Sequence, residues 1–298
     1  MIIKSKKSID TFGAFSLVGF SALLGLNHVI IKVVNEGLHP IFFCGLRSFL
    51  AILFVLLWMF IRKIPIKIDK SNFKNGLLVG LAFTLQFLCL FIALDYTSVI
   101  RTSIIYYSMP IWLTIIAHFF IPNDKFTLLK LIGLIISFFG IILIFSSIDR
   151  SNITSNVIGD FFALGGAIGW ALIIFIAKGT NFSKEKPEMQ LLCMLVVSAP
   201  ILLFISFFFG PVIRDFQIIH IFGILFQSII IVSASFIFWL WLLSIYPASG
   251  VASFAFLTPL FGIFFGWFLL NESLNLSILI SAVMVSFGIT LINKNNSS

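Results

Sequence analysis

Two prolines stand inside apolar stretches at corresponding places in the two halves of the sequence, Pro110 and Pro259. A proline within a helix lacks a backbone N–H, so the carbonyl four residues earlier loses its helical hydrogen bond. Those carbonyls belong to Tyr106 and Ala255, and in an apolar medium each needs another polar partner. Matched interruptions of this kind are typical of binding sites at the midplane of a membrane. We expect the prolines to line such a site or its gate; the alternative is that they only kink helices.

Two basic residues, Lys32 and Arg47, also lie inside apolar stretches. A cation within a membrane span is rare and usually faces a cavity or a partner rather than lipid. Lys32 could pair with Glu36 in the loop that follows, or extend to the membrane interface. Arg47 lies deeper, where backbone carbonyls could hold it for structural reasons. If these cations act on a ligand, they would hold an anionic group such as a carboxylate.

Three neutral polar residues, Asn27, His28 and Gln86, interrupt the first and third apolar stretches. His28 could carry a proton near neutral pH, although a lone histidine is more often a hydrogen-bonded packing residue. Gln86 could orient a ligand, but buried amides also hold helices to each other. The sequence leaves both alternatives open for each residue.

Aromatic residues flank the first of the two prolines. Tyr106, Tyr107, Ser108 and Trp112 could line an aromatic, amphipathic cavity, and Trp239 could do the same from the second half. The chain contains 38 phenylalanines, so an aromatic residue near a site is weak evidence by itself. Packing against lipid is the alternative for all of them.

The composition describes a membrane protein. Hydrophobic residues make up 60% of the chain and charged residues 10%, against about 25% charged residues in soluble domains. The net charge of +8 does not form a basic face, because the charges fall in short gaps between apolar runs, and we therefore expect no nucleic-acid partner. The three cysteines lie inside apolar runs without paired spacing, as small core residues do.

Apolar runs of about 20 residues, the length that crosses a bilayer, predict an all-α membrane protein with ten transmembrane helices. We place the spans near residues 12–34, 41–61, 73–94, 100–120, 128–146, 157–177, 189–209, 218–243, 250–270 and 276–292. The gaps between them are too short to hold a soluble domain.

Lysine and arginine predict the orientation of these spans. With the N-terminus in the cytoplasm, fourteen of the 19 basic residues fall in cytoplasmic segments and three in external ones, namely Arg101, Arg150 and Arg214. Such a bias is the positive-inside signal. The sequence therefore predicts a multi-pass protein of the cytoplasmic (inner) membrane with both termini inside.

The second half of the sequence repeats the first. Gly13, Phe15 and Lys32 match Gly159, Phe161 and Lys178 at one constant offset, and the tripeptide Phe139-Gly140-Ile141 recurs as 287–289. Each half holds an odd number of predicted spans, so the two copies must have opposite orientations. We expect one five-helix repeat in residues 1–150 and a second, inverted repeat in residues 151–298, an architecture common among secondary transporters.

These features together resemble the drug/metabolite transporter superfamily, in particular its EamA-type branch. The resemblance covers nearly the whole chain and rests on Gly159-Asp160, on Arg47 soon after Pro40, on the two prolines with the segments leading into their spans, and on the Asn271-Glu272 turn. It implies a carrier of small metabolites, amino acids or toxic compounds. Two positions depart from the family pattern. Asn123-Asp124 replaces the usual pair in the first half, and Arg101 stands where a small residue is usual, which places a cation at the predicted outer mouth.

Several chemistries have no motif in this sequence. It has no P-loop, no His-Glu-x-x-His and no Gly-x-Ser-x-Gly, so we expect neither ATP hydrolysis, nor an enzyme site, nor a metal or other cofactor. No carboxylate stands at the centre of a predicted span, which leaves exchange and facilitated diffusion open beside proton coupling.

We therefore expect a secondary transporter that exports a small amino-acid-like, amphipathic or zwitterionic metabolite by alternating access. Its partners would be the substrate, the lipid bilayer and, through the less polar fifth and tenth spans, a second copy. A lipid or lipid-linked sugar flippase of the same architecture is the main alternative, and a membrane enzyme is a weaker one.

Overall fold

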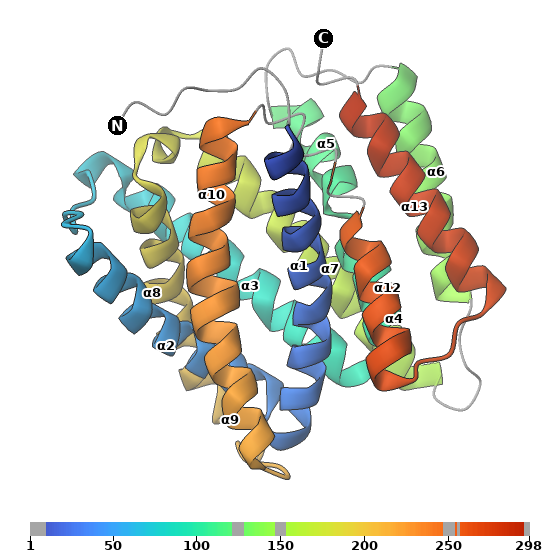
Figure 1. Ribbon diagram of the computed structural model, residues 1–298, viewed down its shortest axis with the longest axis horizontal. Helices are drawn as coiled ribbons and strands as arrows, with labels where there is room; N and C mark the ends of the chain where they lie inside the picture. Colours follow the sequence, from blue (N-terminus) through green and yellow to red (C-terminus); the bar gives the residue numbers. More distant parts are fainter. Residues whose placement is uncertain (1–9, 121–127, 147–152, 247–253, 255–256, 295–298) are drawn as a thin grey trace.

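The computed structural model describes residues 10–120, 128–146, 153–246, 254 and 257–294 of the chain. In these ranges helices are joined by short connections, and the β-type pairing consists of one isolated antiparallel bridge between Leu38 and Ile213. The predicted all-α class is confirmed (Figure 1).

The helices follow the predicted apolar runs closely. In the first half they are α1 (Thr11–Gly37), α2 (Pro40–Ile61), α3 (Phe73–Tyr96), α4 (Val99–Tyr106), α5 (Met109–Phe120) and α6 (Leu128–Ser146). In the second half they are α7 (Ile153–Gly179), α8 (Pro187–Ser206), α9 (Ile218–Leu225), the π-helix η4 (Phe226–Ser235), α10 (Phe236–Ile245), α12 (Leu257–Leu270) and α13 (Leu276–Lys294). The short turns η1 (Lys70–Asn72) and η3 (Asn181–Lys184) precede α3 and α8.

Seven helical segments of the described chain are long and apolar enough to cross a membrane. They are Thr11–Gly37, Pro40–Ile61, Lys70–Tyr96, Val99–Phe120, Asn156–Ala177, Pro187–Ser206 and Ile218–Trp239. Shorter apolar helices, Leu131–Ile144, Leu257–Leu270 and Leu276–Leu291, occupy the places of the fifth, ninth and tenth predicted spans. Residues 247–253 and 255–256, where we expected the ninth span to begin, lie outside the described residues. The total of ten spans stays a prediction.

Both prolines lie in the first turn of a helix, which differs from the expected mid-helix position. Helix α4 ends at Tyr106 and α5 begins at Met109, so Pro110 is the second residue of α5, and Pro259 is the third residue of α12. A proline in the first turn removes an N–H that has no helical partner in any case. The fourth span is therefore two consecutive helices, and its break falls at Tyr107 and Ser108.

The first helix of each half packs against the other half at an equivalent place. A Cβ atom on Gly13 would lie 2.6 Å from the ring of Tyr246, and one on Gly159 would lie 2.6 Å from Cβ of Thr97. These glycines match each other in the sequence repeat. The residues they touch, Tyr246 and Thr97, belong to matching sequence segments, 246–248 and 96–98. Only a residue without a side chain allows both approaches. The contacts agree with a repeated architecture, while its inverted orientation stays a prediction.

One end of the bundle, which we call the Arg214 end, is closed by polar ties. It is the end at which α1 and α3 finish and α9 begins (the lower end in Figure 1). Arg214 donates to Asp95 through both terminal nitrogens, at 2.6 and 2.8 Å, and to the carbonyl of Asn35 at 2.8 Å. The Leu38–Ile213 bridge lies beside this ion pair. The connection between α8 and α9 is thereby fixed to the α1–α2 turn.

Glu272 connects the two halves at the N-terminus of α4. Its carboxylate accepts hydrogen bonds from the backbone N–H groups of Val99 at 2.7 Å and Ile100 at 2.9 Å. Ser98 accepts a third bond, from the N–H of Arg101 at 3.1 Å. A carboxylate at this place satisfies unpaired donors and complements the helix dipole.

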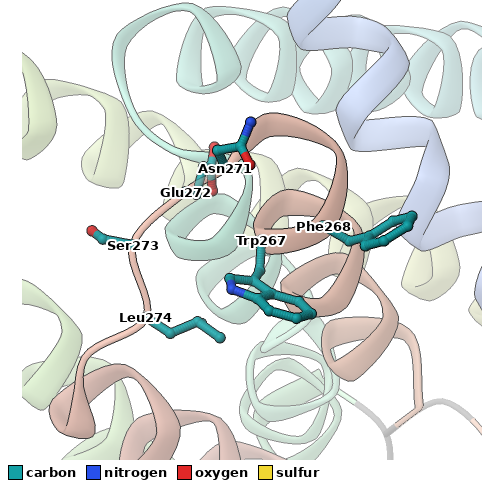
Figure 2. Close-up of a pocket in the computed structure, with 6 residues that line it drawn as sticks. All are labelled: Trp267, Phe268, Asn271, Glu272, Ser273 and Leu274. Atoms are coloured by element: carbon teal, nitrogen blue, oxygen red, sulfur yellow. The ribbon is translucent and has the colours of Figure 1, made fainter.

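Figure 2 shows Glu272 at the turn that follows α12. A pocket of about 520 Å³ lies beside this turn. It is lined by Trp267, Phe268, Asn271, Glu272, Ser273 and Leu274.

We predict that Glu272→Gln lowers the apparent melting temperature in detergent by several degrees. Hydrogen bonds to a charged acceptor contribute about 1.5–3 kcal/mol, and the amide keeps only part of that. Glu36→Gln is the matched control, because Glu36 is an exposed acid near the same end. Equal melting of the two variants would contradict the role given to the Glu272 carboxylate.

Candidate functional site

A set of polar and aromatic side chains from both halves meets inside the bundle, and we call it the central cluster. Its members come from α1, α2, α3, α4, α7 and η4: Asn27, His28, Arg47, Gln86, Ser103, Tyr106, Tyr107, Trp170 and Gln227. All of them except Trp170, which is half-buried, are buried. Six of the nine are residues that the sequence singled out.

His28 is the contact point between α1 and α4. It has no exposed surface, and its Nδ1 is hydrogen-bonded to Oγ of Ser103 at 2.9 Å. Its ring stacks on Tyr107, with centroids 5.1 Å apart, and meets the edge of Tyr106 at 5.4 Å. The other ring nitrogen, Nε2, has no hydrogen-bond partner among the described residues. His28 is thus held at one nitrogen and free at the other.

Tyr106 ends α4 and connects this contact to α3 and α7. Its hydroxyl accepts a hydrogen bond from Nε2 of Gln86, and its ring stacks on Trp170 with centroids 5.3 Å apart. Tyr107 meets the same indole at 5.9 Å, and its hydroxyl donates to the carbonyl of Leu24 at 3.1 Å. The three rings and His28 together form an aromatic wall with polar edges.

Arg47 on α2 is buried completely and has an unusual environment. Its guanidinium lies over the rings of Phe87 and Phe91, 4.1 and 4.7 Å from their centroids. Nη1 donates to Oε1 of Gln227 at 3.5 Å, while Nε and Nη2 have no hydrogen-bond partner among the described residues. Aromatic faces attract a cation, but they do not supply hydrogen-bond acceptors in the guanidinium plane.

Gln227 joins Arg47 to α1. Its Nε2 donates to Oδ1 of Asn27 at 2.7 Å and to the backbone carbonyl of the same residue at 3.3 Å. Gln227 is the second residue of the π-helix η4, and π-helical turns inside α-helices frequently occur at functional sites. The hydrogen bonds that join Gln227 to Asn27 and to Arg47 therefore connect the two halves of the chain.

The remaining predicted residues lie apart from these contacts. Trp112 donates from Nε1 to Oγ of Ser108 at 3.2 Å, and Ser108 donates to the carbonyl of Ile105 at 2.5 Å. These bonds close the break between α4 and α5 just before Pro110. Trp239 has its ring contact with Phe236 on its own helix, so the structure does not bring it into the central cluster.

Lys32 does not form the expected pair with Glu36. Its Nζ instead donates to the carbonyls of Thr97 at 2.6 Å and Leu94 at 3.3 Å, at the C-terminal end of α3. A helix C-terminus has unpaired carbonyls and negative polarity, so a cation is stabilised there. Lys32 therefore ties α1 to the end of α3, which neither the pair with Glu36 nor extension to the interface describes, while a role in holding an anionic ligand stays a prediction.

Arg101 is not an open cation at the mouth of the protein, as its place in the sequence suggested. It is 5% exposed and forms an ion pair with the buried Asp160 at the start of α7, with Nε donating to Oδ1 at 3.1 Å. Thr97 also donates to this carboxylate, at 3.3 Å. Burial and pairing remove Arg101 from any surface that would meet a substrate.

Sequence reasoning left Ser103, Trp170 and Gln227 out of the candidate site. One signal for Trp170 was present, because Gly165 and Gly169 have the spacing that lets helices approach closely. A Cβ atom on Gly169 would lie 2.9 Å from Cα of Gln86. This approach of α7 to α3 is what places Trp170 against Tyr106. Among the described residues, no three His, Cys, Asp or Glu side chains gather as metal ligands would.

The comparison with known families gives a clear match. The sequence model of the EamA-like transporter family matches residues 11–146 and 157–294. A crystal structure with 14% sequence identity superposes with a TM-score of 0.65, covering 95% of this chain and 96% of the other. At that identity the superposition shows a shared fold alone.

Curated relatives are similar over most of their length. The chain is 26% identical to the uncharacterized transporter YoaV of Bacillus subtilis over 92% of this chain and 94% of the relative. It is 27% identical to the uncharacterized transporter YvbV of the same organism, over 94% and 91%. It is 24% identical to a probable amino-acid metabolite efflux pump of Escherichia coli, over 89% of each chain.

We predict that Arg101→Leu is strongly destabilising and that Asp160→Leu added to it restores most of the loss. Removing one partner of a buried ion pair leaves an uncompensated charge and costs about 3–5 kcal/mol, whereas replacing both partners with apolar residues is often neutral. The melting temperature and the detergent-soluble yield of each variant measure the loss of stability. A double variant whose loss equals the sum of the losses of the two single variants would show that the two residues act independently.

Proposed function

Because the chain belongs to the EamA-like transporter family, we propose that it exports a small amino-acid-like metabolite across the cytoplasmic membrane by alternating access. The family and the named relatives are transporters, so the protein is not an enzyme. The single observation that carries the proposal is the central cluster. It combines a buried cation, two unpartnered nitrogens of Arg47 and an aromatic wall, and both halves of the chain contribute to it.

The chemistry of the cluster suits an amphipathic ligand of small size. Tyr106, Tyr107 and Trp170 offer apolar faces, while Arg47, Asn27 and Gln227 offer polar groups beside them. Sites of this composition orient a ligand through few polar contacts and bind its body through apolar ones. The named efflux pump of amino-acid metabolites among the relatives supports the same substrate class.

The architecture supports alternating access. In transporters built from inverted repeats, the site lies where the repeats meet and one group of helices rocks against the other. Here the fourth span is broken at Tyr107 and Ser108, directly beside the cluster, and Pro110 and Pro259 begin the helices that follow their respective segments. We infer that these two helix starts act as gates. The ties at the Arg214 end would then open when the site faces that side.

Both termini are proposed to lie in the cytoplasm. Helix α1 begins and α13 ends at the same end of the bundle (Figure 1), which agrees with an even number of spans. The positive-inside bias assigns that end to the cytoplasm and the Arg214 end to the exterior. Helices α6 and α13 lie side by side at one edge, with broad apolar exposure (Figure 1). We propose this edge as the contact of a homodimer.

The test is counterflow in liposomes. We expect purified protein to accumulate labelled amino acids or related metabolites saturably, and a pH gradient to change the rate if protons are coupled. The double variant Pro110→Ala/Pro259→Ala is expected to lose at least tenfold in rate, because both helix starts gain an N–H and conformational freedom.

Pro65→Ala provides the matched control, since Pro65 is exposed in the connection after α2. It should transport as the wild type does. If folded wild-type protein moves no small solute, the proposal is wrong, and a flippase assay with labelled lipid or lipid-linked sugar becomes the next experiment.

A further inference from the structure

We propose that Arg47 is the carboxylate receptor of the substrate site, so that the transported compounds are small carboxylic acids with an apolar or aromatic body. The inference rests on the proposed transport function and specifies its chemistry.

The charge of Arg47 has no counter-ion in the described part of the chain. An ionised group buried without a partner is so costly that buried charges are normally paired or hydrogen-bonded on all sides. Four of the described acids that are not exposed are engaged elsewhere: Asp95 with Arg214, Asp160 with Arg101, Glu272 with the N-terminus of α4, and Glu185 with Asn72. The part of the chain that the structure describes therefore holds a cation at its centre and supplies no anion for it.

The free nitrogens of Arg47 are the pair that binds a carboxylate best. Nη1 is the nitrogen that contacts Gln227, and Nε and Nη2 have no hydrogen-bond partner by distance and angle among the described residues, although the neutral thiol of Cys44 lies near the guanidinium. Nε–H and one N–H of Nη2 are parallel and lie on the same edge of the planar guanidinium. That edge matches the two oxygens of a carboxylate in a bidentate fork.

The surroundings hold Arg47 ready for such a ligand. The rings of Phe87 and Phe91 lie beside the guanidinium, with their centroids 4.1 and 4.7 Å from its Cζ. These rings attract the charge without occupying the hydrogen-bonding edge. Arg47 lies about 10 Å along α2 from its start, at 1.5 Å per residue, so it is placed well inside the span rather than at the interface.

The rest of the substrate would meet the aromatic wall of the central cluster. Gln227 contacts both Arg47 and Asn27, and the neighbouring residue His28 stacks on Tyr107. None of the residues in the central cluster carries a carboxylate. A substrate ammonium group would therefore be held by amide oxygens and aromatic faces. The carboxylate is accordingly the group on which recognition depends, and the ammonium group contributes less.

Acid and amide pairs test the inference. With labelled leucine or phenylalanine as the counterflow substrate, unlabelled leucine and phenylalanine should compete at least tenfold better than leucinamide and phenylalaninamide. Arg47→Gln should abolish saturable uptake, and Arg47→Lys should weaken it at least tenfold, because lysine keeps the charge but lacks the planar fork.

Stability measurements separate this role from a structural one. Arg47→Met should melt at the same temperature as the wild type or higher, because it removes an unpaired buried charge. Excess leucine or phenylalanine should raise the melting temperature of the wild type but not of this variant. Lys32→Met is the matched control: it removes a half-buried cation that is hydrogen-bonded to backbone carbonyls, should lower the melting temperature, and should leave the preference for acid over amide unchanged.

Three other outcomes would contradict the role proposed for Arg47 or the transport function itself. Equal competition by acids and amides, or an Arg47→Gln variant that still prefers acids, would show that Arg47 is not the receptor while transport itself stands. A large loss of stability in Arg47→Met would assign Arg47 a structural role. If folded wild-type protein transports none of these acids or any other small solute, the proposed function fails and this inference fails with it.

Discussion

The structure depends on one constraint, which is that backbone and charged groups inside a bilayer must find partners within the protein. Helix α4 shows the consequence most directly. It has eight residues and starts and stops within what would otherwise be a single span. Its first N–H groups are satisfied by Glu272 from the other half of the chain, and its end is closed through Ser108. The start of α4 is thus satisfied by a distant part of the sequence, and the break at its end is satisfied by local hydrogen bonds.

The same constraint decides which charges are available for function. Arg101, Arg214 and Lys32 are each neutralised or surrounded by acceptors, and each of these contacts fixes one helix to another. Arg47 is the described buried cation for which this is not so. The basic residues that hold the fold together and the one that we propose for a ligand thus differ in what their nitrogens contact.

Much of this could be predicted from the sequence, and the reason is physical. Polar residues are rare in apolar spans, so Asn27, His28, Arg47 and Gln86 stood out, and all four meet in the central cluster. Partners across helices could not be predicted, because they depend on how the helices rotate and approach. For that reason the sequence did not reveal that Lys32 donates to backbone carbonyls rather than to Glu36. The break at Tyr107 and Ser108 was misplaced because a proline marks a break without fixing its position to the residue.

An unpaired charge at the centre also bears on how transport is driven. If the substrate is a carboxylic acid without an ammonium group, its carboxylate and Arg47 form a neutral pair in the loaded protein, whereas the empty protein encloses a bare cation. Passing through the closed state then costs more free energy when empty than when loaded. Such a cycle favours exchange of one acid for another over return of the empty carrier. It would need no carboxylate at the middle of a span, and the sequence places none there.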